Sequence, residues 1–293
     1  MINSKKMKNI GRLALFMAAL LWGVSFVMMK NVLENISPLY ILAIRFCGSA
    51  LVLLPACSGK LKKLDKSYLI GGVLMGIALL LGYIFQTYGL RLTTPGKNAF
   101  LTSVYCVIVP FLYWAYRKKR PDRFNAMAAL ICIIGIGLIS LDGDLRIGTG
   151  DALTILCGLF FALHIVVTAR FLEKREPLLL AMLQFATVGV ISLIGALLFE
   201  QPPSVLTSAD IWSVAYLTFI CTAGCLLMQI FGQKYTPPSQ AAVILTFESV
   251  FGALASVVLY HEILTIRLTF GFAFTFAAVL ISETKLEFLR KKG

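Results

Sequence analysis

Charged side chains are scarce in this chain. Only 14% of its 293 residues are Asp, Glu, Lys or Arg, whereas 59% are hydrophobic and the mean hydropathy is +0.86. Soluble domains carry about 25% charged and about 45–50% apolar residues, so a soluble domain is excluded. Apolar runs of about 20 residues favour membrane-spanning helices over barrel strands, because a helix satisfies its own backbone hydrogen bonds in lipid. We therefore expect an all-α polytopic membrane protein.

Acidic residues are the scarcer sign of charge, with 14 Asp and Glu against 27 Lys and Arg and a net charge of +13. In a soluble protein this excess would suggest a nucleic-acid partner. Here the basic residues lie in short loops between apolar runs, where they fix the orientation of a membrane protein. The sequence therefore predicts contact with the lipid bilayer and no nucleic-acid partner.

Motifs for direct ATP use, metal binding and cofactor binding are also missing. There is no Walker A sequence, so ATP is not the direct energy source. The seven cysteines lie in or at the ends of apolar runs, and only Cys221 and Cys225 share a helix face, without further ligands beside them. We expect reduced cysteines that serve packing, no metal and no cofactor.

Gly, Pro and charge clusters divide the chain into ten apolar segments. The basic N-terminus precedes an apolar run that continues to Met29, which indicates an uncleaved first span rather than a signal peptide. The predicted spans are 11–31, 38–57, 68–90, 96–116, 124–141, 151–171, 177–199, 211–233, 238–260 and 266–284.

An internal repeat organises these spans. The segment 85–103, FQTYGLRLTTPGKNAFLTS, aligns without a gap with 228–246, MQIFGQKYTPPSQAAVILT, and five of nineteen positions are identical where about one is expected by chance. A second alignment pairs 21–46 with 160–185 at a shift of 139 positions, whereas the first has a shift of 143. We read two related halves, 1–146 with spans 1–5 and 147–293 with spans 6–10.

The loops give the orientation. If the N-terminus lies inside, twenty-one Lys and Arg fall on the inner side and four on the outer side. This bias predicts cytoplasmic termini in a multi-pass protein of the cell membrane, the inner membrane of a bacterium. Five spans per half is an odd number, so the second half enters the membrane from the opposite side and the repeats are inverted.

Trp22-Gly23-x-Ser25-Phe26, followed by Lys30, Pro38 and Arg45-Phe46, resembles the drug/metabolite transporter superfamily, in particular its EamA-type family. The second half carries a similar ending, Tyr260-His261-Glu262, in which His261 replaces the usual glycine of a Gly-Glu pair. The resemblance covers nearly the whole chain. It implies ten transmembrane helices as two inverted five-helix EamA-like repeats, a central cavity, and movement of small organic solutes, often outward.

Glu248 is the best-placed ionisable residue for a site in the membrane. It lies ten residues into the span 238–260, about 15 Å along a helix, which is near the midplane. An ionisable group at that depth costs about 2.5–3.5 kcal/mol, so a function is the first hypothesis. Glu248 either binds a substrate ammonium or carries a proton, and the alternative is a structural pair with a buried polar group.

The other candidate site residues either lie less deep in the membrane or are suggested by the alignment of the two repeats. Arg45, seven residues into its span, either clamps a carboxylate or phosphate or snorkels outward along its aliphatic stem. The alignments place His164 opposite Ser25 and Tyr105 opposite Glu248, near the expected pseudo-two-fold axis. Trp22 enters mainly through the family motif, and Asn98 through its position in the first turn of the fourth span, where helix-terminal donors can contact anionic groups.

These observations together predict a secondary transporter that moves small organic, amino-acid-like or related metabolites, with efflux as the expected direction and proton coupling as an option. The expected substrate-binding residues are Trp22, Ser25, Arg45, Asn98, Tyr105, His164 and Glu248. The alternative is a membrane-embedded enzyme acting on a lipid or small apolar substrate, but the spans carry no nucleophile elbow and no zinc-binding helix motif. The protein is expected to be a monomer or a homodimer.

Overall fold

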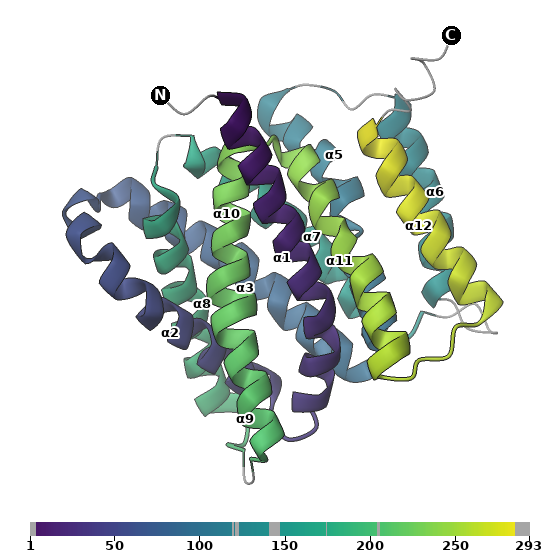
Figure 1. Ribbon diagram of the computed structural model, residues 1–293, viewed down its shortest axis with the longest axis horizontal. Helices are drawn as coiled ribbons and strands as arrows, with labels where there is room; N and C mark the ends of the chain where they lie inside the picture. The colour runs from purple at the N-terminus through teal and green to yellow at the C-terminus, as the bar shows by residue number, and fades with distance from the viewer. Residues whose placement is uncertain are drawn as a thin grey trace.

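The computed structural model describes residues 4–118, 120, 123–140, 147–173, 175–203 and 206–284. These residues form a bundle of closely packed helices that run up and down between two ends (Figure 1). The helices of the first half are α1 (Ser4–Val32), α2 (Pro38–Cys57), α3 (Lys66–Leu92), α4 (Pro95–Thr102), α5 (Tyr105–Arg117) and α6 (Arg123–Ser140). Those of the second half are α7 (Thr149–Leu172), α8 (Pro177–Phe199), α9 (Ser208–Ala215), α10 (Cys225–Tyr235), α11 (Pro238–Leu259) and α12 (Ile266–Thr284).

Within the described residues, eight helical segments are long and apolar enough to cross a membrane, and two shorter apolar helices, Ala126–Ile139 and Ile266–Ile281, accompany them. The prediction of an all-α multi-pass protein is therefore confirmed. The limits of α2 and α8 coincide with the predicted spans, because proline at the first helical position marks where each helix begins.

Two of the predicted spans are not uniform α-helices. The span predicted at 96–116 breaks at Ser103 and Val104 into α4 and α5. The span predicted at 211–233 contains a nine-residue π-helical segment, η2 (Tyr216–Gly224), between α9 and α10. A short 3₁₀ segment, η1 (Ser58–Lys63), follows α2.

Helices of one half pack mainly against helices of the other. The most extensive contacts join α1 to α10 and α11, α7 to α3, α2 to α8, and α6 to α12. At the α2–α8 contact the repeat-related Phe46 and Phe185 are both fully buried, with ring centroids 5.9 Å apart. Because lipid is as apolar as the side chains, such close packing rather than hydrophobicity holds the helices together.

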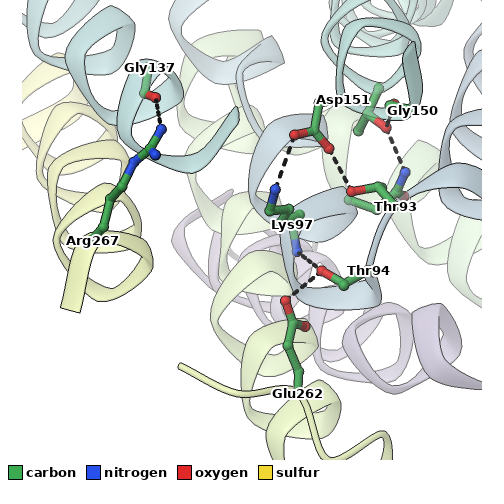
Figure 2. Close-up of polar contacts among 10 residues, drawn as sticks. Thr93, Thr94, Lys97, Gly137, Gly150, Asp151, Glu262 and Arg267 are labelled. Carbon is green, nitrogen blue, oxygen red and sulfur yellow. Dashed lines mark hydrogen bonds and ion pairs between the residues drawn. The ribbon is translucent and has the colours of Figure 1, made fainter. Parts of the chain in front are cut away.

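Glycine allows the closest approach at two of these contacts. A Cβ on Gly23 of α1 would lie 2.3 Å from Cβ of Phe251 in α11, and one on Gly135 of α6 would lie 2.4 Å from Oγ1 of Thr275 in α12. Beside the second contact, Arg267 of α12 donates to the carbonyl of Gly137 in α6 (3.3 Å; Figure 2). Larger residues at either glycine would force the helices apart.

The bundle has two ends, which we name by their turns. At the α3–α4 end, α1 finishes beside the last turn of α3, because Lys30 contacts the carbonyls of Leu90 and Arg91. At the α10–α11 end, α1 begins beside the last turn of α10, where Gly11 lies against Gly232. A cavity lies between these ends.

Candidate functional site

Helices α1, α2, α3, α5, α7, α10 and α11 surround a cavity of about 60 Å³. Its walls combine aromatic and aliphatic surface with several polar groups. The lining residues are Trp22, Ser25, Phe26, Met29, Arg45, Leu79, Tyr83, Gln86, Thr87, Leu90, Tyr105, Phe161, His164, Ile165, Leu226, Gln229, Leu245 and Glu248. Six of the seven residues predicted for the site therefore line one cavity.

Glu248 of α11 meets Tyr105 of α5, its partner in the repeat alignment. The Tyr105 hydroxyl donates to Oε1 of Glu248 at 3.1 Å, and both side chains are buried. The break at Ser103 and Val104 ends α4 there and lets α5 begin at Tyr105. In the described part of the chain Oε2 of Glu248 has no hydrogen-bond partner, so this oxygen is available to a proton or to a donor group of a solute.

Arg45 is buried and does not snorkel to the membrane surface. Only 2% of its surface is exposed, and Nε donates to Oγ1 of Thr222 at 3.0 Å. Its guanidinium carbon lies 5.0 Å from the ring centroid of Tyr83 and 5.8 Å from that of Phe46, within the range of cation–π attraction. Among the described residues no side chain pairs with the two terminal amino groups, which leaves the guanidinium fork able to bind a carboxylate or phosphate.

The π-helical segment η2 holds several of the cavity's polar side chains. Trp22 donates through Nε1 to the carbonyl of Cys221 (2.8 Å), and Ser49 donates to that of Thr218 (2.9 Å). Thr222 donates to the carbonyl of Leu217, five residues earlier, while accepting from Arg45. The wider turn of a π-helix frees carbonyls that an α-helix would use internally, which is why such segments recur at functional sites.

His164 of α7 is held within the second half. Its Nε2 lies 2.9 Å from Oε1 of Gln184, the repeat partner of Arg45, and 3.3 Å from Oγ1 of Thr168. A neutral imidazole with its proton on Nε2 donates to that amide oxygen. Ser25, the repeat partner of His164, donates to the carbonyl of Trp22 (2.7 Å).

Asn98 is the predicted site residue that the structure places elsewhere. It is fully buried, and its amide donates to the carbonyl of Gln86 (3.2 Å) and to Oγ1 of Thr154 (2.7 Å). These bonds join α4 to α3 and α7 and point the side chain away from the cavity lining. Its position in the first turn of α4 serves helix packing instead.

Repeat-related pairs of residues line much of the cavity, beyond the two pairs, Ser25/His164 and Tyr105/Glu248, that the sequence predicts. Both members of six pairs line it: Trp22/Phe161, Ser25/His164, Phe26/Ile165, Tyr83/Leu226, Gln86/Gln229 and Tyr105/Glu248. Gln86 and Gln229 were missed as site residues, although their identity in the aligned repeat was the available signal. The two glutamines add paired amide donors and acceptors to the wall.

In the part of the chain that the structure describes, no three His, Cys, Asp or Glu side chains lie close enough to hold a metal ion. None of the seven cysteines forms a disulfide, and six of them are buried.

The fold and the cavity define a multi-pass membrane protein with a polar chamber among its helices. The EamA-like transporter family model matches the chain twice, over residues 9–141 and 148–284, and the chain belongs to this family. Because it belongs to this family, the protein is a membrane transporter. Family membership also favours transport over an enzymatic activity.

Relatives named as transporters are similar to this chain over most of their length. An uncharacterized transporter of Archaeoglobus fulgidus is 33% identical over 274 residues, covering 94% of this chain and 86% of the relative. The uncharacterized transporter YoaV of Bacillus subtilis is 24% identical, covering 88% and 91%. One crystal structure shares the fold with a TM-score of 0.72 at 16% identity, covering 95% of this chain and 98% of that one.

Proposed function

We propose that this protein is a secondary transporter that works by alternating access, with residues 1–146 and 147–293 forming two inverted five-helix repeats. The observation that carries the proposal is the cavity wall, to which six repeat-related pairs contribute both members. A site shared between two oppositely oriented halves can be exposed to either side of the membrane by equivalent movements. The two family matches, one in each half, support this division.

The distribution of basic residues supports the orientation. Twenty-one Lys and Arg fall on the side of the N-terminus and four on the other, so we place both termini in the cytoplasm of a cell-membrane protein. In this proposal α6 and α12 are the fifth and tenth spans, which complete five helices in each half. The α3–α4 end then faces outward.

Two opposite charges in one cavity support a zwitterionic, amino-acid-like solute. Arg45 presents a guanidinium fork suited to a carboxylate, and Glu248 presents a carboxylate oxygen suited to an ammonium or a proton. Trp22, Tyr83 and Phe161 supply apolar wall for a side chain. Efflux as the direction rests on the family resemblance.

The cavity must widen before it can hold such a solute. Ligand sites usually enclose about 300–1,000 Å³, far more than the water-sized space observed here. Movement of the helices is therefore part of the proposed mechanism.

Counterflow in proteoliposomes tests the proposal. Vesicles are preloaded with an unlabelled amino acid, and exchange of a labelled panel of amino acids, matched amines and matched carboxylates is measured. We expect zwitterions to exchange about tenfold faster than solutes that lack one charge. Arg45→Lys should weaken affinity for carboxylate-bearing solutes, because lysine lacks the planar fork.

Gln184→Asn, at the repeat-related position outside the cavity wall, is the matched control for Arg45→Lys. The same vesicles are assayed for chemical conversion of the panel. Absence of exchange for every solute, or conversion of a solute in place of exchange, would overturn the transporter proposal.

A further inference from the structure

Three charged side chains from three different segments converge on the α3–α4 turn, residues 90–97. They are Lys30 at the end of α1, Asp151 at the start of α7 and Glu262 in the α11–α12 connection. Figure 2 shows Asp151 and Glu262 approaching Lys97 and Thr94 from opposite sides of the turn. Two of the three come from the second half, so the group joins the halves across one end of the cavity.

Lys30 binds the last turn of α3. Its ammonium donates to the carbonyls of Leu90 (2.8 Å), Arg91 (3.0 Å) and Thr93 (2.8 Å). These carbonyls have no helical partners of their own, and they carry the negative end of the helix dipole. Because Leu90 also lines the cavity, this contact holds the end of α1 over the cavity wall.

Asp151 binds both sides of the turn. Its Oδ1 accepts from the Thr93 hydroxyl (2.5 Å) and its Oδ2 from the Lys97 ammonium (3.4 Å). The carboxylate is almost fully buried, so an outward movement of α7 would separate it from every partner it has in the described residues.

Glu262 binds the N-terminus of α4. Its Oε1 accepts from the Thr94 hydroxyl, and its Oε2 accepts from the amide of Gly96 (3.0 Å) and from the Ser256 hydroxyl. A carboxylate at a helix N-terminus faces unsatisfied amides and the positive end of the dipole. Glu262 thus joins α11 to α4 by charge-assisted bonds.

Among the described residues, the repeat-related turn at the other end, residues 233–240, has one counterpart of these contacts. Ala169 stands where Lys30 does and has no donor, while Arg12 replaces Asp151 and donates to Gln240 (3.1 Å). Lys119, which replaces Glu262, lies outside the described residues. A hollow of about 320 Å³ opens at this end, with walls from α1, α5, α7, α10 and the turn.

A hollow of about 520 Å³ also exists at the α3–α4 end, but its walls include α6 and α12 and none of α1, α3, α7 or α10. Thr94, Lys97 and Glu262 line it, so it adjoins the charged group, and it shares no lining residue with the cavity. The hollow at the α10–α11 end is instead walled by helices that also line the cavity.

We propose that Lys30, Asp151 and Glu262 form a clasp that keeps the α3–α4 end closed in the absence of solute, so that the cavity opens first at the α10–α11 end. The inference rests on the proposed transport function and adds which end is the default exit and which residues set it. Opening the α3–α4 end requires three charged groups, of which Asp151 is almost fully buried, to leave their hydrogen-bond partners together. At the other end the described residues show one repeat-related bond, Arg12 to Gln240. Ion pairs also join the halves there, namely Lys60 and Lys63 with Glu176, Arg117 with Glu173, and Arg175 with Asp65, but their side chains are partly exposed to solvent, whereas Asp151 is buried.

Cysteine accessibility tests the clasp without knowledge of the solute. Gln86→Cys places a thiol in the cavity wall, and its reaction with a membrane-impermeant, positively charged thiol reagent is timed in intact cells and in inside-out vesicles. The parent chain, which keeps its seven native cysteines, gives the background. In the otherwise unaltered protein we expect labelling about tenfold faster from the α10–α11 side.

Adding Asp151→Asn and Glu262→Gln, which keep shape but remove charge, should raise labelling from the α3–α4 side about tenfold or more. Arg12→Met, the matched change at the other end, should leave that rate unchanged. If the double variant does not fold, Thr94→Val and Ser256→Ala each remove one partner of Glu262 and should raise the rate in the same direction.

Equal labelling of the clasp variants and their parent from the α3–α4 side overturns the clasp, and leaves the transport proposal standing if counterflow persists. Labelling of Gln86→Cys from neither side in any folded variant overturns both, because the cavity would then lead to neither surface.

Discussion

The two halves of the chain share their helix arrangement but differ in the charges they bring to the cavity. Arg45 of the first half reaches across to Thr222 of the second, whereas its partner Gln184 binds His164 within its own half. At the other repeat-related position the first half carries neutral Tyr105 and the second carries Glu248. Each half thus contributes one charge of opposite sign, at positions that are not related to each other.

This difference shows that packing determines the positions of the helices but not the charges that they carry into the cavity. Helix positions follow from small residues and prolines that recur in both halves, such as Pro95 and Pro238. The charges sit on a common backbone frame and can change without disturbing it. We infer that the helix arrangement provides a cavity shared by both halves, and that the charges of Arg45 and Glu248 determine which solute binds.

The strongest test of the comparison concerns orientation, because the outcome is all or none. Gly59 and Thr149 are both exposed. A cysteine introduced at either position should react with an impermeant reagent, and the two positions should react from opposite sides of the membrane. Gly59 is expected to react from the cytoplasm and Thr149 from outside, because three predicted spans, 68–90, 96–116 and 124–141, lie between the two positions. Reaction of both from one side would exclude inverted halves.

Glu248→Gln should have the next largest effect. The amide keeps the shape of the side chain and can still accept from Tyr105, so the protein should fold, but the charge in the second half is lost. We expect solute flux to fall by about tenfold or more in proteoliposomes. If Glu248 carries the proton, the response of flux to a pH step should disappear as well.

Tyr105→Phe is the control, since it removes the hydroxyl and leaves the carboxylate. Unchanged flux and an unchanged pH response in Glu248→Gln would return Glu248 to a structural role.

Thr222→Val should have a moderate effect, because it removes the acceptor that orients Arg45 and keeps the side-chain volume. A hydrogen bond contributes about 1 kcal/mol net, so we expect solute affinity to fall about fivefold, with flux at saturation less affected. Thr218→Val on the same π segment is the matched control, because its hydroxyl bonds only to Val214 among the described residues. Equal effects of the two changes would mean that the segment and not Arg45 was perturbed.

The smallest expected effect is at the seam between α2 and α8. Glu176, outside the spans, accepts from Lys63 (2.6 Å) and Lys60 (3.0 Å), and these bonds, Lys63 first, lower its pKa from 4.5 to about 2. A lowered pKa stabilises the folded state above pH 4.5, and this contribution is lost as the pH falls toward 2.

Replacing both lysines by Met should therefore lower Tm slightly at pH 7 and make Tm less sensitive to acid between pH 5 and 3. The expected change is small because the pair is solvent-exposed. Lys62→Met, a neighbouring exposed residue without an ion pair among the described residues, should leave both unchanged. A larger loss in the control would assign the effect to net charge.

Much of the helix framework was predictable, since proline and charge mark the ends of α2 and α8 in the sequence itself. The break before Tyr105 and the π segment were not predictable, because neither contains a proline. Each contains a hydroxyl-to-carbonyl bond, Ser103 to Phe100 in the break and Thr222 to Leu217 in the π segment. Such bonds are available to any serine or threonine in a helix, so composition alone does not locate them.

The candidate site was predictable where the repeat placed residues in pairs, as with Tyr105 and Glu248. For Arg45 the sequence left two alternatives open, a site and a snorkelling side chain, and for Asn98 it gave only a position in the first turn of a span. Hydropathy gives depth in the membrane but not the direction of a side chain around its helix, and that direction put Arg45 in the cavity and Asn98 outside its lining.

The packing of α1 against α10 has a consequence for synthesis. Trp22 finds its hydrogen-bond partner, the carbonyl of Cys221, 199 residues later in the chain. A ribosome adding about 5–20 residues per second needs roughly 10 to 40 s to make that length. Through this interval α1 lies in the bilayer without α10 or α11, so its indole and the face around Gly23 must be met by lipid, by the insertion machinery or by α3. Shortened chains that end before α10 should therefore be preferred substrates of membrane proteases, although every helix of their first half is present.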